Sequence, residues 1–226
     1  MTVAIMDLEK ARFNMIEQQI RPWNVLDPVV LDMLTVVRRE DFVPAEHRDL
    51  AYADVEIPLK KQAAANQRML APRIEAKILQ ALALRNTDKV LLVGAGSGFL
   101  AALLAAKAEF VYAVEIDPEL VAFARSNLLR ADVANVSVDL GDGAAGWPLY
   151  TPYDAIVVTG SMAAIPPAML AQLRIGGRAV AVVGSAPAME LLMVTRTAED
   201  AFATTGVLET ALAPLDNVSS ACRFTF

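Results

Sequence analysis

The sequence has almost no cysteine or histidine, and this scarcity limits the chemistry open to the protein. It contains one cysteine, Cys222, and one histidine, His47, among 226 residues. A single cysteine cannot form an internal disulfide, which fits a reducing compartment, so we expect the protein to be cytoplasmic. One residue of each kind is too few for a zinc site built from them, and we predict no metal centre.

The sequence also lacks a long uninterrupted apolar run and an excess of basic residues. Although 55% of the residues are hydrophobic, charges and glycines interrupt every stretch that could span a membrane. The N-terminus has no basic region followed by a long apolar one, so we predict no secretory signal. The net charge of −6 argues against general nucleic-acid binding, which needs a basic face. We therefore expect neither a membrane nor a nucleic acid as a partner.

The strongest pattern that is present is an apolar run followed by closely spaced glycines. Residues 90–93 indicate a buried strand of a parallel sheet, and an Ala/Leu-rich helix is expected after the glycines. A strand that turns sharply into a helix needs residues without a Cβ, and it leaves helical N–H groups facing whatever lies above the sheet. The pattern predicts a cofactor site formed by Gly94, Ala95, Gly96, Ser97 and Gly98.

The glycine spacing favours S-adenosylmethionine over a dinucleotide. In the dinucleotide pattern G-x-G-x-x-G the third glycine would stand at Phe99, but here it comes one residue earlier. Glu115 ends the apolar run 110–114, and a carboxylate at the tip of the second strand accepts hydrogen bonds from ribose hydroxyls. We therefore assign Glu115 and Ile116 to cofactor binding and place a nicotinamide dehydrogenase last among the alternatives.

From residue 90 onward strands and helices alternate, which is typical of a doubly wound parallel sheet. Strands are predicted near 90–94, 110–115, 136–140, 154–159 and 178–184, then an antiparallel pair near 190–197 and 204–213. Gly176-Gly177 is the expected turn into the fifth strand, and Asp117 the expected N-cap of a helix.

The residues before the glycine pattern predict mainly helices. They are expected at 8–20, after Asp27-Pro28 and from Pro72, with residues 45–71 as a loop. The predicted organisation is an N-terminal helical and loop segment at 1–85, on the substrate side, and a Rossmann-like α/β core at 86–226.

With these elements in place, the chain resembles the protein-L-isoaspartate O-methyltransferase family. Residues 90–105 look like that family's first motif, and 111–115 are similar to its ribose-binding strand. The run Gly141-Asp142-Gly143, followed by Gly146-Trp147-Pro148, resembles its adenine-side segment. The resemblance covers most of residues 12–185.

The resemblance implies the fold, the cofactor and the reaction. It implies a seven-stranded sheet, mostly parallel with an antiparallel C-terminal strand. It implies S-adenosylmethionine as methyl donor, S-adenosylhomocysteine as product, and a place beside the adenine for Gly141, Asp142 and Gly143. The implied activity is protein repair, in which L-isoaspartyl carboxylates of damaged peptides or proteins are methylated by a monomer or dimer.

The sequence departs from the family on the acceptor side. Where the family has a Gly-Gln-Thr-Ile-Ser-x-Pro-like stretch, Arg68 stands at the threonine position and Leu70 at the serine position. We predict that Gln67 and Arg68 act on the acceptor, the latter as a bidentate partner for an anion. Thr159 and Ser161, at the end of the fourth strand, are predicted to contact it as well.

Two alternatives follow from this departure. Without the family's hydroxyls, the acceptor could be a small-molecule carboxylate, hydroxyl or amine. The chain could also be a non-catalytic protein that senses S-adenosylmethionine or S-adenosylhomocysteine, and it would then bind without turnover.

Overall fold

The computed structural model describes residues 7–218, so Cys222 lies outside the described range. Its centre is a seven-stranded sheet in the order β5-β4-β3-β6-β7-β8-β9. The strands are β3 (Lys89–Val93), β4 (Phe110–Glu115), β5 (Val136–Leu140), β6 (Tyr153–Met162), β7 (Leu173–Ser185), β8 (Ala188–Ala198) and β9 (Ala201–Glu209). Strands β3 to β7 are parallel, whereas β8 and β9 each run antiparallel to their neighbours. This confirms the predicted mixed sheet.

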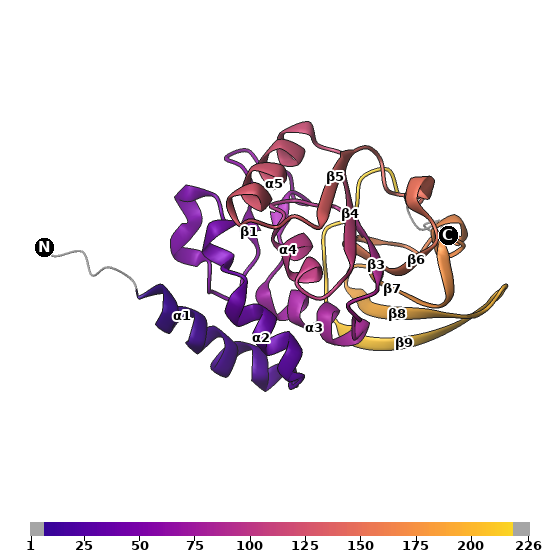
Figure 1. The fold of residues 1–226 in the computed structure, drawn as a ribbon, viewed down its shortest axis with the longest axis horizontal. Helices are drawn as coiled ribbons and strands as arrows, with labels where there is room; N and C mark the ends of the chain where they lie inside the picture. Colours follow the sequence, from indigo (N-terminus) through magenta and orange to yellow (C-terminus); the bar gives the residue numbers. More distant parts are fainter. Residues whose placement is uncertain (1–6, 219–226) are drawn as a thin grey trace, which may run out of the picture.

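The sheet separates two apolar layers because successive side chains of a strand point to opposite faces. In β3, Val90 and Leu92 enter one core, and Leu91 and Val93 enter the other. The first core is covered by α3 (Pro72–Leu82), α4 (Phe99–Ala105) and α5 (Pro118–Arg130), which lie together on one face of the sheet (Figure 1). The second core is covered by the short helix α6 (Pro167–Leu170) and by aromatic side chains.

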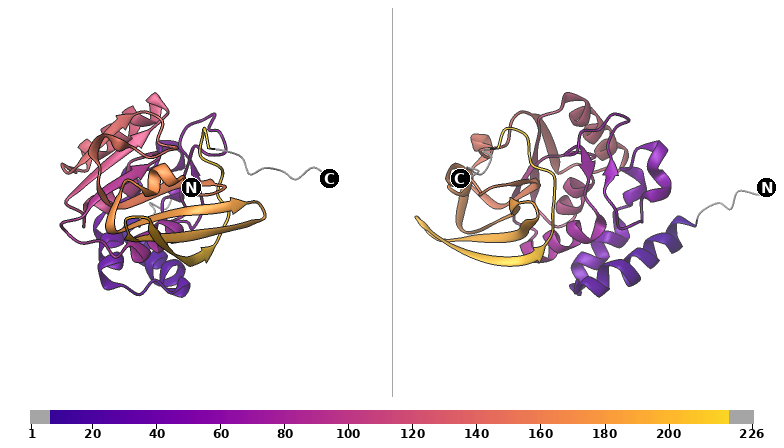
Figure 2. Two further views of the ribbon diagram at one scale, coloured as in Figure 1. Left: turned by 90° about the vertical axis from the view of Figure 1, so that its right-hand side faces the viewer. Right: turned by 180° about the vertical axis from the view of Figure 1, so that it is seen from behind.

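The N-terminal helices pack outside this helical layer. Helix α1 (Leu8–Met15) continues as a π-helical turn, and α2 (Pro28–Val36) begins at Asp27, whose carboxylate accepts a 2.8 Å hydrogen bond from the Val29 amide. Their buried side chains belong to the same core cluster as α3 and the sheet. The views from the front and from behind place these helices opposite the projecting β8–β9 hairpin (Figure 2). The division near residue 85 stays a prediction.

Two local predictions were wrong. Residues 45–71 are not one loop: Ala45–Leu50 form a 3-10 helix, and β1 (Ile57–Pro58) pairs with β2 (Arg68–Met69) in an antiparallel hairpin. Gly176 and Gly177 lie inside β7 instead of preceding it, at a register shift against β6. Close packing explains the position, since a Cβ on Gly177 would lie 2.9 Å from the Arg174 carbonyl.

Within residues 7–218, none of the helices combines the length and the apolar character that crossing a bilayer requires.

Candidate active site

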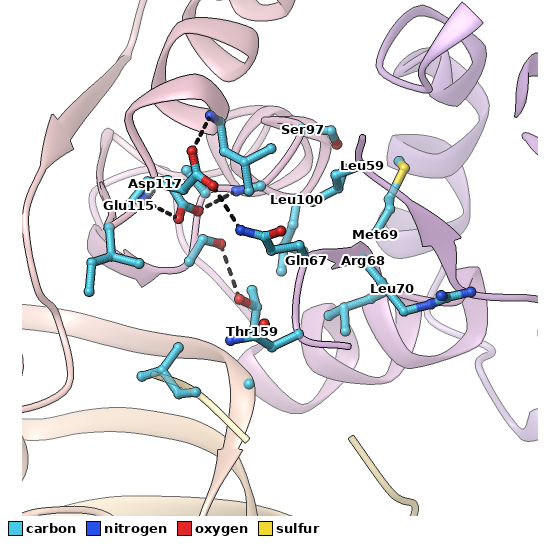
Figure 3. Close-up of a pocket in the computed structure, with 18 of the residues that line it drawn as sticks. Leu59, Gln67, Arg68, Met69, Leu70, Ser97, Leu100, Glu115, Asp117 and Thr159 are labelled. Atoms are coloured by element: carbon cyan, nitrogen blue, oxygen red, sulfur yellow. Dashed lines mark hydrogen bonds between the residues drawn. The ribbon is translucent and has the colours of Figure 1, made fainter. Parts of the chain in front are cut away.

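A cavity opens where the direction of the strand order reverses. The chain passes from β3 to β4 on one side, and from β5 it crosses over to β6 on the other side of β3. The loops leaving β3 and β6 therefore diverge at their carboxyl ends, which is where open parallel sheets bind ligands. The cavity is lined mainly by residues 66–70, 94–97, 115–117, 159–160 and 215–216, together with Leu59, Glu75, Leu100 and Leu120 (Figure 3).

The turn after β3 is held directly against β6. Gly94 has a φ of +88°, and a Cβ at this position would collide with Thr159 Oγ1. The Thr159 hydroxyl donates to the carbonyls of Val93 and Gly94, at 3.1 and 3.2 Å. Only glycine permits both the backbone conformation and this close approach. Thr159 therefore lines the cavity, while its proton is used by the backbone of the turn, and its contact with the acceptor stays a prediction.

Glu115 is presented to the cavity by two backbone amides. Its side chain accepts hydrogen bonds from the amides of Gly96 at 2.9 Å and Asp117 at 3.1 Å, one on each carboxylate oxygen. Each oxygen keeps a further lone pair for another donor. These oxygens stand beside a turn without side chains, so they fit the two hydroxyls of a ribose.

Asp117 does more than cap helix α5. One carboxylate oxygen accepts from the amides of Glu119 and Leu120, and the other accepts from Lys60 Nζ at 2.6 Å and Gln67 Nε2 at 2.7 Å. Burial opposes the charged form, but the hydrogen bonds from Lys60 and the backbone outweigh it and hold the pKa of Asp117 below its usual value. The carboxylate thus ties the loop between β1 and β2 across the cavity.

Gln67, directly before β2, and Arg68, the first residue of β2, point in different directions (Figure 3). The Gln67 amide is shared between Asp117 and the Ala64 amide, which donates to Gln67 Oε1 at 3.0 Å. Arg68 lines the rim of the cavity with its guanidinium turned outward, 3.5 Å from a carboxylate oxygen of Glu56. Burial raises the pKa of Glu56 despite Arg68 beside it.

Several predicted site residues lie away from the cavity wall. Ser161 is buried and donates to the Leu212 carbonyl at 2.9 Å, and Gly98 packs against α5. Gly141, Asp142 and Gly143 follow β5 outside the lining, where the Asp142 carboxylate accepts from the Ala144 amide and from Asn217 Nδ2 at 2.9 Å each. The structure therefore brings together the glycine turn, Glu115, Ile116, Gln67, Arg68 and Thr159.

Two acidic residues of the lining were not predicted from the sequence. Glu75 comes from the first turns of α3, and Asp216 from a segment that forms a parallel bridge with Ser161 through Pro214. Both are far in sequence from the glycine turn, and neither belongs to a recognisable motif. Burial raises the pKa of Glu75 to about 7, although Arg39 forms an ion pair with it.

Known proteins of one family match most of this chain. A sequence model described as protein-L-isoaspartate(D-aspartate) O-methyltransferase matches residues 10–220. A protein-L-isoaspartate O-methyltransferase of Rhodopseudomonas palustris is 43% identical over 83% of this chain and 85% of its own length. One of Methylorubrum populi is 40% identical over 86% of this chain and 89% of its own.

Solved structures share the fold at lower identity. A protein-L-isoaspartate O-methyltransferase superposes with a TM-score of 0.78 at 22% identity, over 93% of this chain and 66% of its own. A putative one from Plasmodium falciparum, solved with S-adenosyl-L-homocysteine, gives 0.76 at 17% identity, over 92% of this chain and 97% of its own. On the sequence matches, the chain belongs to the protein-L-isoaspartate(D-aspartate) O-methyltransferase family.

Proposed function

We propose that this protein transfers a methyl group from S-adenosylmethionine to the side-chain carboxylate of L-isoaspartyl residues in proteins. One observation carries the proposal: in a chain of this family, the glycine turn, Glu115 and the loop at 66–70 surround a single cavity at the switch point of the sheet. The predicted S-adenosylmethionine site at residues 94–98, 115–116 and 141–143 is part of the same proposal.

The residues present fit this cofactor and need little acid–base chemistry. S-adenosylmethionine supplies a methyl group on a positively charged sulfur. An isoaspartyl carboxylate is already ionised near neutral pH, so no base has to remove a proton. Glu115 and the turn after β3 orient the donor, while Leu59, Leu70 and Leu100 exclude water from the cavity. A dry, aligned site favours a step in which opposite charges are neutralised.

We assign the acceptor side to the segment that contains Gln67 and Arg68. It forms the rim of the cavity opposite Glu115 and supplies its exposed cationic group, the Arg68 guanidinium. A guanidinium recognises a carboxylate through two parallel hydrogen bonds. In this assignment Thr159 shapes the wall, and Ser161 contributes through the segment it binds at Leu212.

The Arg68 assignment predicts a selective kinetic defect. We expect Arg68→Ala to raise the KM for an isoaspartyl peptide by about 10-fold or more, because a charge-assisted contact is lost. Affinity for S-adenosylhomocysteine should stay the same, since Arg68 points away from Glu115. Arg48→Ala, at another exposed arginine beside a carboxylate, is the matched control. An unchanged KM in Arg68→Ala would remove Arg68 from the acceptor site.

The activity is tested with labelled S-adenosylmethionine and two peptides that differ only in containing isoaspartate or aspartate. Base-labile label on the isoaspartyl peptide alone is the expected result. Tight binding of S-adenosylhomocysteine without label on either peptide would contradict the proposed acceptor and favour a small molecule or a sensing role. The replacement of the family's two hydroxyl side chains by Arg68 and Leu70 is the observation behind that second candidate.

A further inference from the structure

Glu75 is a buried carboxylate at the cavity that the proposed reaction does not use. It lies in α3 with 1% of its surface exposed, yet it lines the same cavity as Gly94–Ser97 and Glu115. A charge is placed in such a position only when a partner offsets the loss of hydration. Arg39, equally buried, is the partner that the structure provides.

The ion pair leaves one oxygen of Glu75 available. Arg39 Nη1 donates to Oε2, while Arg39 Nη2 donates to the Leu70 carbonyl at 2.6 Å. No donor within residues 7–218 forms a hydrogen bond with Oε1. Oε1 is nevertheless accessible, because it is not among the fully buried polar atoms that lack a partner. Since the residue lines the cavity, the open side of Oε1 is the cavity itself.

The other carboxylates of the lining are less suited to hold a cation. Glu115 is held by two backbone amides in the position proposed for the ribose. Asp117 already accepts from two amides, Lys60 and Gln67. Asp216 is exposed to solvent, where a charge pair is weak. With Glu115 assigned to the ribose, Glu75 is the remaining carboxylate of the lining that combines a free acceptor with a buried position, which strengthens an electrostatic contact.

We propose that Glu75 Oε1 accepts a hydrogen bond from the α-ammonium group of the cofactor's methionine part. The inference rests on the proposed function, because S-adenosylmethionine and S-adenosylhomocysteine both carry this group. The turn 94–97, Leu70, Leu100 and Glu75 line the same cavity as Glu115, so a cofactor with its ribose at Glu115 would share this cavity with Glu75. Arg39 is then a positioning residue, which fixes the carboxylate and the Leu70 carbonyl together.

The test measures binding of S-adenosylhomocysteine and of an analogue in which hydrogen replaces the α-amino group, by calorimetry on the full chain. We expect wild type to prefer S-adenosylhomocysteine by about 10- to 100-fold, the value of one charge-assisted hydrogen bond. In Glu75→Gln the amide oxygen must accept the hydrogen bond from Arg39, so the NH2 group faces the cavity and cannot accept one from the ligand. The ratio of the affinities for S-adenosylhomocysteine and the analogue should therefore fall close to one. Affinity for the analogue should change little.

Two controls separate this role from general damage. Glu40→Gln removes another buried carboxylate, paired with Arg38 and Tyr52 but outside the lining, and should retain the wild-type preference. Asp216→Asn tests whether Asp216, another carboxylate of the lining, binds the α-ammonium group instead. If Glu75→Gln does not fold, the pair Arg39→Met with Glu75→Leu replaces both charges by apolar groups and should show the same loss of preference.

The outcomes distinguish a failure of the proposed cofactor from a failure of the role proposed for Glu75. Wild type that binds neither ligand contradicts the proposed cofactor. Suppose that wild type binds S-adenosylhomocysteine tightly. If Glu75→Gln then keeps the preference over the analogue, or if only Asp216→Asn loses it, the role of Glu75 is overturned while the proposed cofactor stands. A variant that loses affinity for S-adenosylmethionine but not for S-adenosylhomocysteine also overturns it, because that pattern belongs to the sulfonium.

Discussion

At the scale of single residues, the carboxylates around the cavity differ in what already holds them. Glu115 is positioned by backbone amides, Asp117 by side chains of another segment, and Glu75 by a buried arginine. Their different partners give chemically identical groups different roles. Each can therefore be examined by a substitution whose effect is specific to its partners.

Glu115→Ala should weaken binding of S-adenosylhomocysteine. Each charge-assisted hydrogen bond to the ribose contributes on the order of 1.5–3 kcal/mol, so affinity should fall at least about 10-fold. Glu109→Ala, directly before the first residue of the same strand, changes an exposed glutamate outside the lining and serves as the control. Equal affinity of the Glu115 variant and wild type in calorimetry would place the ribose elsewhere.

Glu75 should make the free energy of unfolding decrease as pH rises. Its pKa is raised to about 7 by burial, against about 4.3 in an unfolded chain, so the native state binds more protons between these values. The stability that this carboxyl contributes is complete below about pH 4 and is lost as pH rises through about 7. Arg39 is the charged group that faces it, and the pair titrates as a unit.

Urea unfolding of wild type and Glu75→Gln measures this effect. The free energy of unfolding of wild type minus that of the variant should decrease between about pH 5 and about pH 8, by on the order of 1–3 kcal/mol. A difference that stays constant or rises over this range would contradict the raised pKa of Glu75.

At the scale of elements, the β1–β2 loop is joined to helix α5 through one side chain. Lys60 and Gln67 come from the two sides of this loop, and both donate to the same oxygen of Asp117. The N-cap of a helix thus also fixes a loop that precedes it by about 50 residues in the chain. Losing this carboxylate should both weaken the helix start and release the loop.

Asp117→Ala tests both consequences. Loss of the N-cap should lower the free energy of unfolding by about 1 kcal/mol, and Asp27→Ala, at the N-cap of α2, should cost a similar amount. Only Asp117→Ala should speed trypsin cleavage after Lys60 and Lys61. Equal cleavage rates in the two variants would show that Asp117 does not restrain the loop.

The sequence predicted those elements and sites that depend on neighbouring residues. Apolar strands, Asp27-Pro28, Asp117 as a cap and the glycine turn are local patterns, and the structure contains all of them. Glu75, Asp216 and the second role of Asp117 depend on contacts between segments 36 or more residues apart, for which the sequence has no periodic signal. The placement of Gly176-Gly177 was wrong because a bulge and a turn demand the same residues.

At the scale of the whole molecule, segments from both halves of the chain meet at the cavity. The loop before α3 forms one wall, and Leu215 and Asp216 belong to another. Their segment is held to β6, because the amide of Ser161 donates to the Ala213 carbonyl and that of Leu215 to the Ser161 carbonyl, at 2.9 Å each. The sheet therefore supplies only the floor of the site. Both walls lie outside the strands that carry the glycine turn and Glu115.

Shortening the chain after residue 211 should impair the site more than the sheet. This truncation removes Leu215 and Asp216 from the wall and the carbonyl that accepts from Ser161 Oγ. We expect affinity for S-adenosylhomocysteine to fall by about 10-fold or more while far-ultraviolet circular dichroism keeps its wild-type shape. A chain shortened after residue 218 retains residues 212–218 and is the control. Equal affinity of the two truncated chains would show that the wall does not contact the ligand.

The late position of Leu215 and Asp216 also has a consequence for synthesis. A ribosome adds these residues after all seven strands of the sheet have been translated, so a growing chain lacks one wall of the cavity until that point. A small molecule stabilises a fold only by binding the formed site. Until then the sheet is stabilised by its own apolar side chains alone, and protection by the cofactor begins only once residues 215 and 216 have docked beside Ser161.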